Sequence, residues 1–249
     1  MFRNYFILLL LAHIIGDFYI QTNKMARKKE KEISWVLIHS LCYLAVMLIV
    51  TLPVMSVTLI VGVTIAAIFH CLIDVFKFIY ISHIRKRGRF SLIIDRNVFF
   101  TDQILHSLVL LGISYWLANG NLPISLNIIF RNFLNVIGIP GKQIMSWLFA
   151  ILVIHKPTNI AISKFLLNYK PEDYNVKEDR KAGRYIGTVE RIIMLIFIYI
   201  NQYSAIGLVL TAKSIARYER ITKEEHFAEY YLLGTLISTL IAIIVSFVF

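Results

Sequence analysis

Long apolar segments alternate with short polar connections along most of the chain. A bilayer core of about 30 Å requires roughly 20 mostly apolar residues when an α-helix crosses it. Segments of this length predict an all-α fold, a polytopic transmembrane helix bundle of about eight spans. The predicted spans lie near residues 4–21, 35–52, 55–80, 98–117, 141–166, 184–200, 204–219 and 227–249.

A further apolar stretch, ISLNIIFRNFLNVIGI at 124–139, is shorter than a membrane span and contains Arg131. We interpret it as an interfacial or re-entrant helix and not as a ninth span. With this stretch placed in the second half, the sequence predicts two domains. A four-span core covers residues 1–118, and a four-span C-terminal bundle covers residues 119–249.

The distribution of basic residues predicts the orientation of these spans. Four segments hold 20 of the 26 lysines and arginines, and the alternate connections hold none. Cytoplasmic loops of membrane proteins carry an excess of Lys and Arg. We therefore expect a multi-pass protein of the cell inner (plasma) membrane with both termini outside. The basic segments are 22–34, 82–97, 164–184 and 213–223.

The composition agrees with a membrane protein. Hydrophobic residues make up 58% of the 249 residues and charged residues 16%, and the mean hydropathy is +0.69. Soluble domains contain about 45–50% apolar and about 25% charged residues. The basic loops account for the net charge of +11, so we expect the lipid bilayer as a partner and no nucleic acid. Two cysteines cannot form a disulfide framework, and no feature of the sequence specifies an oligomeric state.

Histidine and aspartate recur inside the first four predicted spans, where ionisable side chains are costly and are normally functional. Three of these spans carry His and Asp four residues apart, a spacing that places both on one helix face and allows them to bind one ion. In the predicted topology each Asp lies nearer the cytoplasm and each His one turn deeper. We therefore expect one layer of seven groups: His13, Asp17, His39, His70, Asp74, Asp102 and His106.

These motifs repeat as two-helix hairpins. HIIGDFYI in the first span resembles HCLIDVFK in the third, and LIHSL in the second resembles ILHSL in the fourth. Parallel repeats of this kind surround a pseudo-two-fold axis, with the site between them. The imidazole and carboxylate groups suit one or two divalent metal ions, zinc most plausibly. Asp102 has no counterpart in the repeat and is the candidate general base or bridging ligand, and Lys77 is expected to pair with Asp74 or to reach the interface.

Charged side chains also lie inside the predicted spans of the second half. Glu190 and Arg191 lie about two turns inside one span, and Lys213 and Arg217 form an i,i+4 basic pair in the next. One interpretation is a basic pocket for a phosphate or carboxylate of a substrate, for which arginine is well suited. The alternative is a pair of ion pairs, Glu190–Lys213 and Glu229–Arg217, that hold three helices together.

The motifs resemble the bacterial domain-of-unknown-function 3307 family over nearly the full length of the chain. The resemblance is carried by LLAHIIGDFYIQTNKMA, HCLIDVFK and DQILHSL, and further along by GRYIGTVERIIMLI, AKSIARYE and EYYLLGTL. It implies a family name and no biochemical activity. A looser similarity, limited to the His-rich helices, is to membrane-bound metal-dependent hydrolases.

Three functions from different classes use these residues. The first is a divalent-metal-dependent membrane hydrolase with its active site in the cytoplasmic leaflet and an anionic small-molecule or lipid substrate, such as a phosphoester. The second is a cation- or proton-coupled transporter that uses the same cluster, although transporter sites normally lie near the midplane. The third is a non-catalytic scaffold with a structural metal. In the hydrolase, the metal ligands are His13, Asp17, His39, His70, Asp74 and His106, the catalytic residue is Asp102, and the substrate-binding residues are Glu190, Arg191, Lys213 and Arg217.

Overall fold

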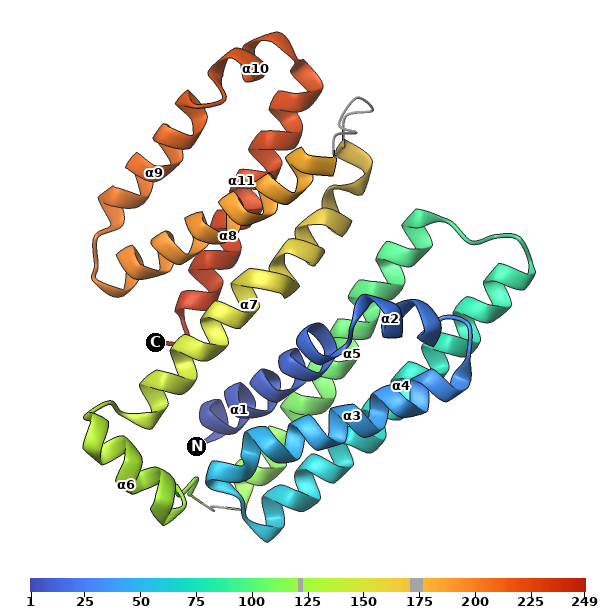
Figure 1. Cartoon of the computed structure of the whole chain (residues 1–249), viewed down its shortest axis with the longest axis vertical. Helices are drawn as coiled ribbons and strands as arrows, with labels where there is room; N and C mark the ends of the chain where they lie inside the picture. Colours follow the sequence, from blue (N-terminus) through green and yellow to red (C-terminus); the bar gives the residue numbers. More distant parts are fainter. Residues whose placement is uncertain (121–122, 171–176) are drawn as a thin grey trace. The chain divides into compact units, whose positions relative to one another are not determined.

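The computed structural model describes residues 1–120, 123–170 and 177–249, so part of the basic segment at 164–184 lies outside the described residues. Within these ranges every regular element is a helix, as the sequence predicts, and no β-strand occurs (Figure 1). Two compact units, Met1–Phe149 and Ala150–Phe249, divide the chain. This division lies beyond the expected one after residue 118, because side chains such as Ile124 and Met145 pack against the core of the first unit.

Four long helices build the first unit. Each of them contacts two of the others, in the order α1, α3, α4, α5 and back to α1, which closes the four into a ring. Two hairpins related by a pseudo-two-fold axis would give such a ring. The first helix continues directly into a π-helix, η1. The elements are α1 (Phe2–Ile14), η1 (Ile15–Ile20), α3 (Ile33–Thr51), α4 (Val57–Lys86) and α5 (Leu92–Asn119).

Polar side chains define where several of these helices begin. Ser56 and Ser91 precede α4 and α5, and their Oγ atoms accept hydrogen bonds from the backbone N–H groups of Leu59 and Ile94. Such N-caps satisfy backbone donors that have no partner within the helix. The connection between η1 and α3 contains the short helix α2 (Asn23–Lys29), and the 3-10 turn η2 (Leu52–Val54) joins α3 to α4.

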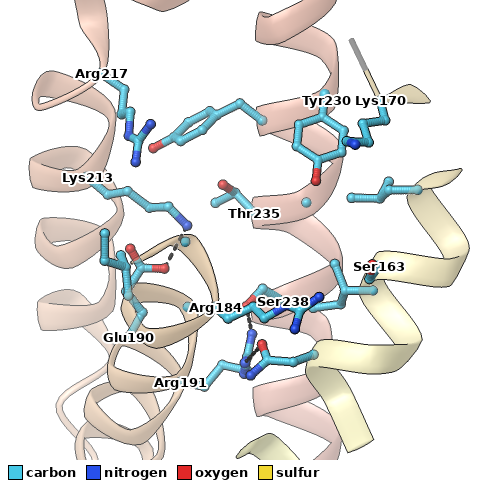
Figure 2. Close-up of a pocket in the computed structure, with 18 of the residues that line it drawn as sticks. Ser163, Lys170, Arg184, Glu190, Arg191, Lys213, Arg217, Tyr230, Thr235 and Ser238 are labelled. Atoms are coloured by element: carbon cyan, nitrogen blue, oxygen red, sulfur yellow. Dashed lines mark hydrogen bonds and ion pairs between the residues drawn. The ribbon is translucent and has the colours of Figure 1, made fainter. Parts of the chain in front are cut away.

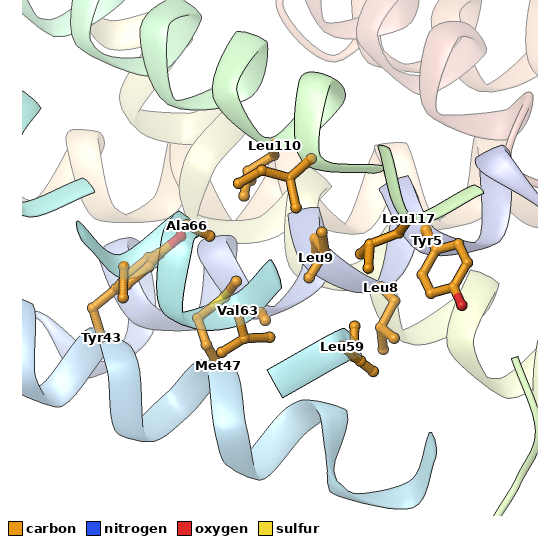
Figure 3. Packing of buried hydrophobic residues seen from close by; sticks show 13 residues of the cluster. Tyr5, Leu8, Leu9, Tyr43, Met47, Leu59, Val63, Ala66, Leu110 and Leu117 are labelled. Carbon is orange, nitrogen blue, oxygen red and sulfur yellow. The ribbon is translucent and has the colours of Figure 1, made fainter. Parts of the chain in front are cut away.

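The apolar core of the first unit lies between the four helices of the ring (Figure 3). In a bilayer, helices associate through close packing because lipid tails are as apolar as the side chains. The contacts in this core are therefore those of interlocking aliphatic groups from all four helices. Its buried side chains include Leu9 of α1, Met47 of α3, Leu59 and Val63 of α4, and Leu110 of α5.

The stretch predicted to be interfacial forms α6 (Ile128–Ile137), a helix of 10 residues. At about 1.5 Å per residue it extends about 15 Å, which is too short to cross a bilayer. It ends at Gly138, whose φ of 68° lies in the left-handed region that favours glycine. Its side chains Ile129 and Val136 are strongly exposed. The prediction that this stretch is not a ninth span agrees with the length of the helix.

The second unit begins within the long helix α7. Its last helix, α11, contacts α8, α10 and the 3-10 turn η3, and α8 also contacts α9. Glutamine and asparagine at the turn after α8 reverse the chain, since Asn201 adopts a left-handed φ of 59°. The elements are α7 (Gly141–Phe165), η3 (Leu166–Tyr169), α8 (Lys177–Tyr199), α9 (Tyr203–Ile215), α10 (Tyr218–Lys223) and α11 (Glu225–Ser246).

Among the described residues, 6 helices are long and apolar enough to cross a membrane, fewer than the predicted eight. The predicted spans at 184–200 and 204–219 fall on α8 and α9, which are not among the six. A continuous helix over 204–219 is wrong, because α9 ends at Ile215 and extends only about 20 Å. The six are Phe2–Ile20, Ile33–Val54, Val57–Lys86, Leu92–Asn119, Gly141–Tyr169 and Glu225–Ser246.

Candidate functional site

Seven ionisable side chains form a polar layer directly next to the apolar core of the first unit. On each helix the core residues and the residues of the polar layer occupy neighbouring turns. On α1, for example, the core residue Ala12 is directly followed by His13. Six of the seven side chains are at most 5% exposed in their residue averages. The structure therefore brings together every predicted ligand of the first half. The polar layer consists of His13, Asp17, His39, His70, Asp74, Asp102 and His106.

Asp17 lies at the centre of the polar layer. Its Oδ1 lies 3.1 Å from His39 Nε2 and 2.8 Å from His70 Nε2, both within hydrogen-bond distance. Its Oδ2 lies 3.8 Å from His13 Nε2 and accepts a hydrogen bond from Gln103 Nε2 at 3.4 Å. One carboxylate thus connects side chains from all four helices of the ring.

The position of Asp17 depends on the π-helix that carries it. In η1 the backbone forms i→i+5 hydrogen bonds, and the N–H of Gln21 donates to the carbonyl of Gly16 at 3.2 Å. This turn is wider than an α-helical one, so Asp17 projects differently from Asp74, which lies on the regular helix α4. The spacing of four residues is shared by the two motifs, but the resulting geometry is not. π-Helical turns occur frequently at functional sites.

Tyr43 lies against both the imidazoles of the polar layer and the π-helical turn at Gly16. Its ring stacks on the imidazole of His70, with 3.7 Å between ring centroids, and its hydroxyl lies 3.3 Å from Nδ1 of His13. A Cβ atom on Gly16 would lie 2.7 Å from Cδ2 of Tyr43, so only glycine permits this approach. The small residue and the aromatic ring therefore position both imidazoles.

Two lysines pair with the outer carboxylates of the polar layer. Lys29 Nζ, at the end of α2, donates to Asp74 Oδ2 at 2.6 Å and to Gln21 Oε1 at 3.0 Å. Lys77 Nζ donates to Asp102 Oδ2 at 2.8 Å. The expected pairing of Lys77 with Asp74 is therefore wrong, because Lys77 reaches toward α5 while Lys29 occupies the oxygen of Asp74.

Several buried ligand atoms in the polar layer lack a hydrogen-bond partner among the described residues. His106 Nε2 and Asp102 Oδ1 are two of them, and they lie 3.5 Å apart. The Nδ1 atoms of His39 and His70 are two more. An unpaired buried polar atom costs about 1–3 kcal/mol, so each of these four atoms favours a further partner such as a bound ligand. Imidazole nitrogens and carboxylate oxygens are atoms that bind divalent cations.

Three groups of side chains in the described chain could each hold a metal ion, since one ligand atom from every member lies within 4.8 Å of the others. Ligand atoms around a tetrahedral zinc ion lie roughly 3.3 Å apart, given bonds of about 2.0–2.1 Å. The distances from Asp17 to His39 and His70 are close to this value. The groups are His13, Asp17 and His70; His39, His70 and Asp74; and Asp17, Asp102 and His106.

Gln103, which the sequence does not mark as a site residue, also contacts the polar layer. Its Nε2 donates to both Asp17 Oδ2 and Asp102 Oδ2, at 3.4 and 3.3 Å, and its Oε1 lies 3.5 Å from His13 Nε2. An amide next to Asp102 inside an apolar span was the available signal. Lys29 was also missed, because it lies in a basic loop where its charge predicts only orientation.

The predicted site residues of the second half line a pocket of about 430 Å³ in the second unit (Figure 2). Lys213 Nζ donates to Glu190 Oε2 at 2.6 Å, so this expected ion pair forms. The expected pair of Glu229 with Arg217 does not form in the described chain. Arg217 points into the pocket, whereas Glu229 lies on the exposed side of α11.

Arg191 is the largest fully buried side chain of the described residues. Its Nε donates to the carbonyl oxygen of Ile154 at 3.0 Å, and its Nη1 donates to Ser238 Oγ at 2.8 Å. Its Nη2 donates to Asn159 Oδ1 at 2.7 Å. The guanidinium therefore joins α7, α8 and α11, a structural role in addition to its place in the pocket wall.

A family model described as a protein of unknown function, DUF3307, matches residues 5–134. The matched segment contains every residue of the polar layer and ends before the pocket of the second unit. No curated protein and no solved structure matches the chain.

Proposed function

The chain belongs to the DUF3307 family, and we propose that it is a membrane hydrolase that depends on one or two divalent metal ions held by the polar layer. The observation that carries this proposal is the placement of His13, Asp17 and His70, one ligand atom of each lying within 4.8 Å of the others. Two imidazoles and one carboxylate are a common ligand set of catalytic zinc, which leaves a position open for water. Zinc is therefore the metal that we propose.

Asp17 and His70 each belong to two of the three groups that could hold a metal, so each would be a ligand whichever of its two groups is occupied. Bound zinc makes a water molecule acidic enough to ionise near neutral pH. The protein's part in this chemistry is to orient the ligands and to remove the proton.

We assign the role of general base to Asp102. Its Oδ1 is buried and has no hydrogen-bond partner among the described residues, while its Oδ2 accepts from Lys77 and Gln103. Two donors thus hold one oxygen in place and leave the other to accept a proton.

The apolar helices make this a membrane protein. We propose the inner membrane, with both termini outside, because the basic segments alternate with connections that carry no Lys or Arg. The turn after α8 reverses the chain, so α8 and α9 run antiparallel. The chain therefore enters α8 and leaves α9 on the same side of the membrane, whether or not these two helices cross it.

Elemental analysis of the purified full-length protein tests the proposal. One or two zinc ions per chain are expected in the wild type, and His70→Ala is expected to lose metal. His83→Ala is the matched control, since His83 lies on the same helix but is exposed. Asp102→Asn is expected to retain at least one ion and to lose hydrolysis of a chromogenic phosphoester. A wild-type protein that contains no stoichiometric metal would refute the proposal.

A cation- or proton-coupled transporter is the second candidate function. The pairs of Lys29 with Asp74 and of Lys77 with Asp102 favour it, because each carboxylate could exchange its ammonium partner for a proton or a cation. Flux in proteoliposomes without hydrolysis would select the transporter. Bound metal with neither activity would select the non-catalytic scaffold.

A further inference from the structure

The pocket of the second unit has a strongly basic wall. Among the described residues that line it, Lys213 is paired with Glu190, the one carboxylate in the lining. Three arginines in the lining form no ion pair within the described chain, and they give the pocket an excess of positive charge. They are Arg184, Arg191 and Arg217.

The guanidinium of Arg191 is buried and forms no ion pair within the described chain, and the neighbouring Glu190 is paired with Lys213. Its side chain donates only to neutral oxygens, those of Ile154, Ser238, Asn159 and Thr188. No carboxylate of the described chain lies within 4.0 Å of its guanidinium. Burying an unpaired charge is unfavourable, so an anion in the adjacent pocket would stabilise this residue.

Further donors in the pocket are available to such an anion. Arg184 is exposed and Arg217 is half-buried; both line the pocket, and neither forms an ion pair within the described chain. The hydroxyl oxygens of Tyr231 and Thr235 are buried and have no hydrogen-bond partner there. Figure 2 shows Arg217, from the turn between α9 and α10, and Thr235, from α11, on the same space. Guanidinium and hydroxyl donors around one space are typical of sites for phosphate.

Apolar side chains line the same pocket. Ile162, Leu166 and Leu167 come from α7 and η3, and Phe227 comes from the start of α11. A ligand that fills the whole pocket therefore needs an apolar part next to its anionic group. A phosphate group carried on a lipid has both.

We propose that this pocket binds a phosphate group, and that the apolar wall favours a lipid phosphate over free phosphate. The phosphate would accept hydrogen bonds from Arg184, Arg217, Tyr231 and Thr235, and its charge would offset that of Arg191. Phosphate binding in this pocket requires no metal in the polar layer, so failure of the metal-dependent hydrolase proposal would leave it unaffected, and the reverse also holds.

Three probes distinguish the sources of the phosphate: phosphatidic acid, diacylglycerol with the same acyl chains, and inorganic phosphate. Binding of each to the full-length protein in detergent is measured by native mass spectrometry. Phosphatidic acid is expected to bind more tightly than either of the other two. Equal binding of phosphatidic acid and diacylglycerol overturns the proposal, and equal binding of inorganic phosphate and phosphatidic acid overturns the assignment to a lipid.

Variants test which side chains hold the phosphate. Arg217→Gln and Arg184→Gln are each expected to weaken the binding of phosphatidic acid about tenfold, the effect of one lost hydrogen bond to a charged group. Lys223→Gln removes the same charge from the other end of α10, outside the pocket, and is expected to bind as the wild type does. Because neither Arg184 nor Arg217 is buried, their variants should fold, which size-exclusion chromatography verifies. Wild-type affinity in both arginine variants overturns the proposal.

Discussion

His70 Nε2 lies 2.8 Å from Asp17 Oδ1, and this contact joins opposite members of the four-helix ring, the extension of α1 and the middle of α4. The ring closes through neighbouring contacts, whereas this pair crosses its centre. Because Asp17 contacts side chains from all four helices, its replacement should change the packing and the ligand geometry of the whole polar layer. The consequences can be measured separately for metal binding, stability and packing.

Asp17 and Asp74 should differ in their effect on metal content, although their motifs repeat in the sequence. Asp17→Asn is expected to remove any ion held at the two groups that contain Asp17, and so to lower the metal content by up to two ions. Asp74→Asn is expected to remove at most one ion, since Asp74 belongs to one group. Inductively coupled plasma mass spectrometry of the purified variants gives both stoichiometries. Equal losses in the two variants would contradict a central role for Asp17.

Loss of Lys77 should destabilise the first unit through the charge that it leaves behind. Lys77→Met is expected to lower the free energy of unfolding by about 2–3 kcal/mol, because it leaves the Asp102 carboxylate, 5% exposed, without its cation. Lys77 itself is partly exposed, so the effect should be smaller than that for a fully buried pair. Asp102→Asn in the same chain is expected to restore most of the stability, as measured by denaturation in detergent.

A surface pair provides the control for this cycle. Arg85 donates to Glu30 between exposed side chains, and Arg85→Gln is expected to change stability by at most about 1 kcal/mol. A loss in Arg85→Gln as large as that in Lys77→Met would show that the cycle measures net charge and not the buried pair.

Gly16→Ala should disturb the packing of Tyr43. The new Cβ would lie 2.7 Å from the tyrosine ring, so the ring or the π-helix must shift, at a cost of about 1–3 kcal/mol. Gly112→Ala on α5 meets no atom within 4 Å and should leave stability unchanged or raise it, since alanine favours helix. Thermal denaturation of the two variants compares them directly, and equal melting temperatures would disprove the packing argument.

The predicted topology can be tested by labelling single cysteines in whole cells. In a chain with Cys42→Ser and Cys71→Ser, a cysteine at Arg87 is expected to react only after the cells are permeabilised. A cysteine at Met55, in the connection that carries no basic residue, is expected to react with an impermeant reagent from outside. Reversed labelling at these two positions would mean that both termini are cytoplasmic.

The sequence predicts the polar layer well, because helical periodicity is enough to relate His and Asp on each span. Four-residue spacing places His70 and Asp74 on one face of α4, and the cost of ionisable groups in lipid directs them inward. The depth of each of these side chains in the membrane then follows from where the predicted spans begin and end. Composition and span lengths give the helical class for the same reason.

Other features depend on contacts that periodicity does not encode. A π-helix at Ile15–Ile20 carries no sequence signature, and it separates the geometry of Asp17 from that of Asp74. The partner of Lys77 depends on which neighbouring helix offers an unpaired carboxylate. The end of α9 at Ile215 is also not indicated by the sequence. The charged residues around it, Lys213 and Arg217, are equally compatible with a loop and with the wall of a pocket.

The hydrogen bond from Lys29 to Asp74 makes the first interhelical connection part of the site. A divalent ion that takes Oδ2 of Asp74 as a ligand competes with the ammonium group for the same oxygen. Metal loading is then an exchange of one cation for another, and the binding free energy contains the cost of releasing α2. By thermodynamic reciprocity, anything that holds Lys29 on Asp74 would weaken metal binding at this oxygen, and bound metal would weaken this attachment of α2.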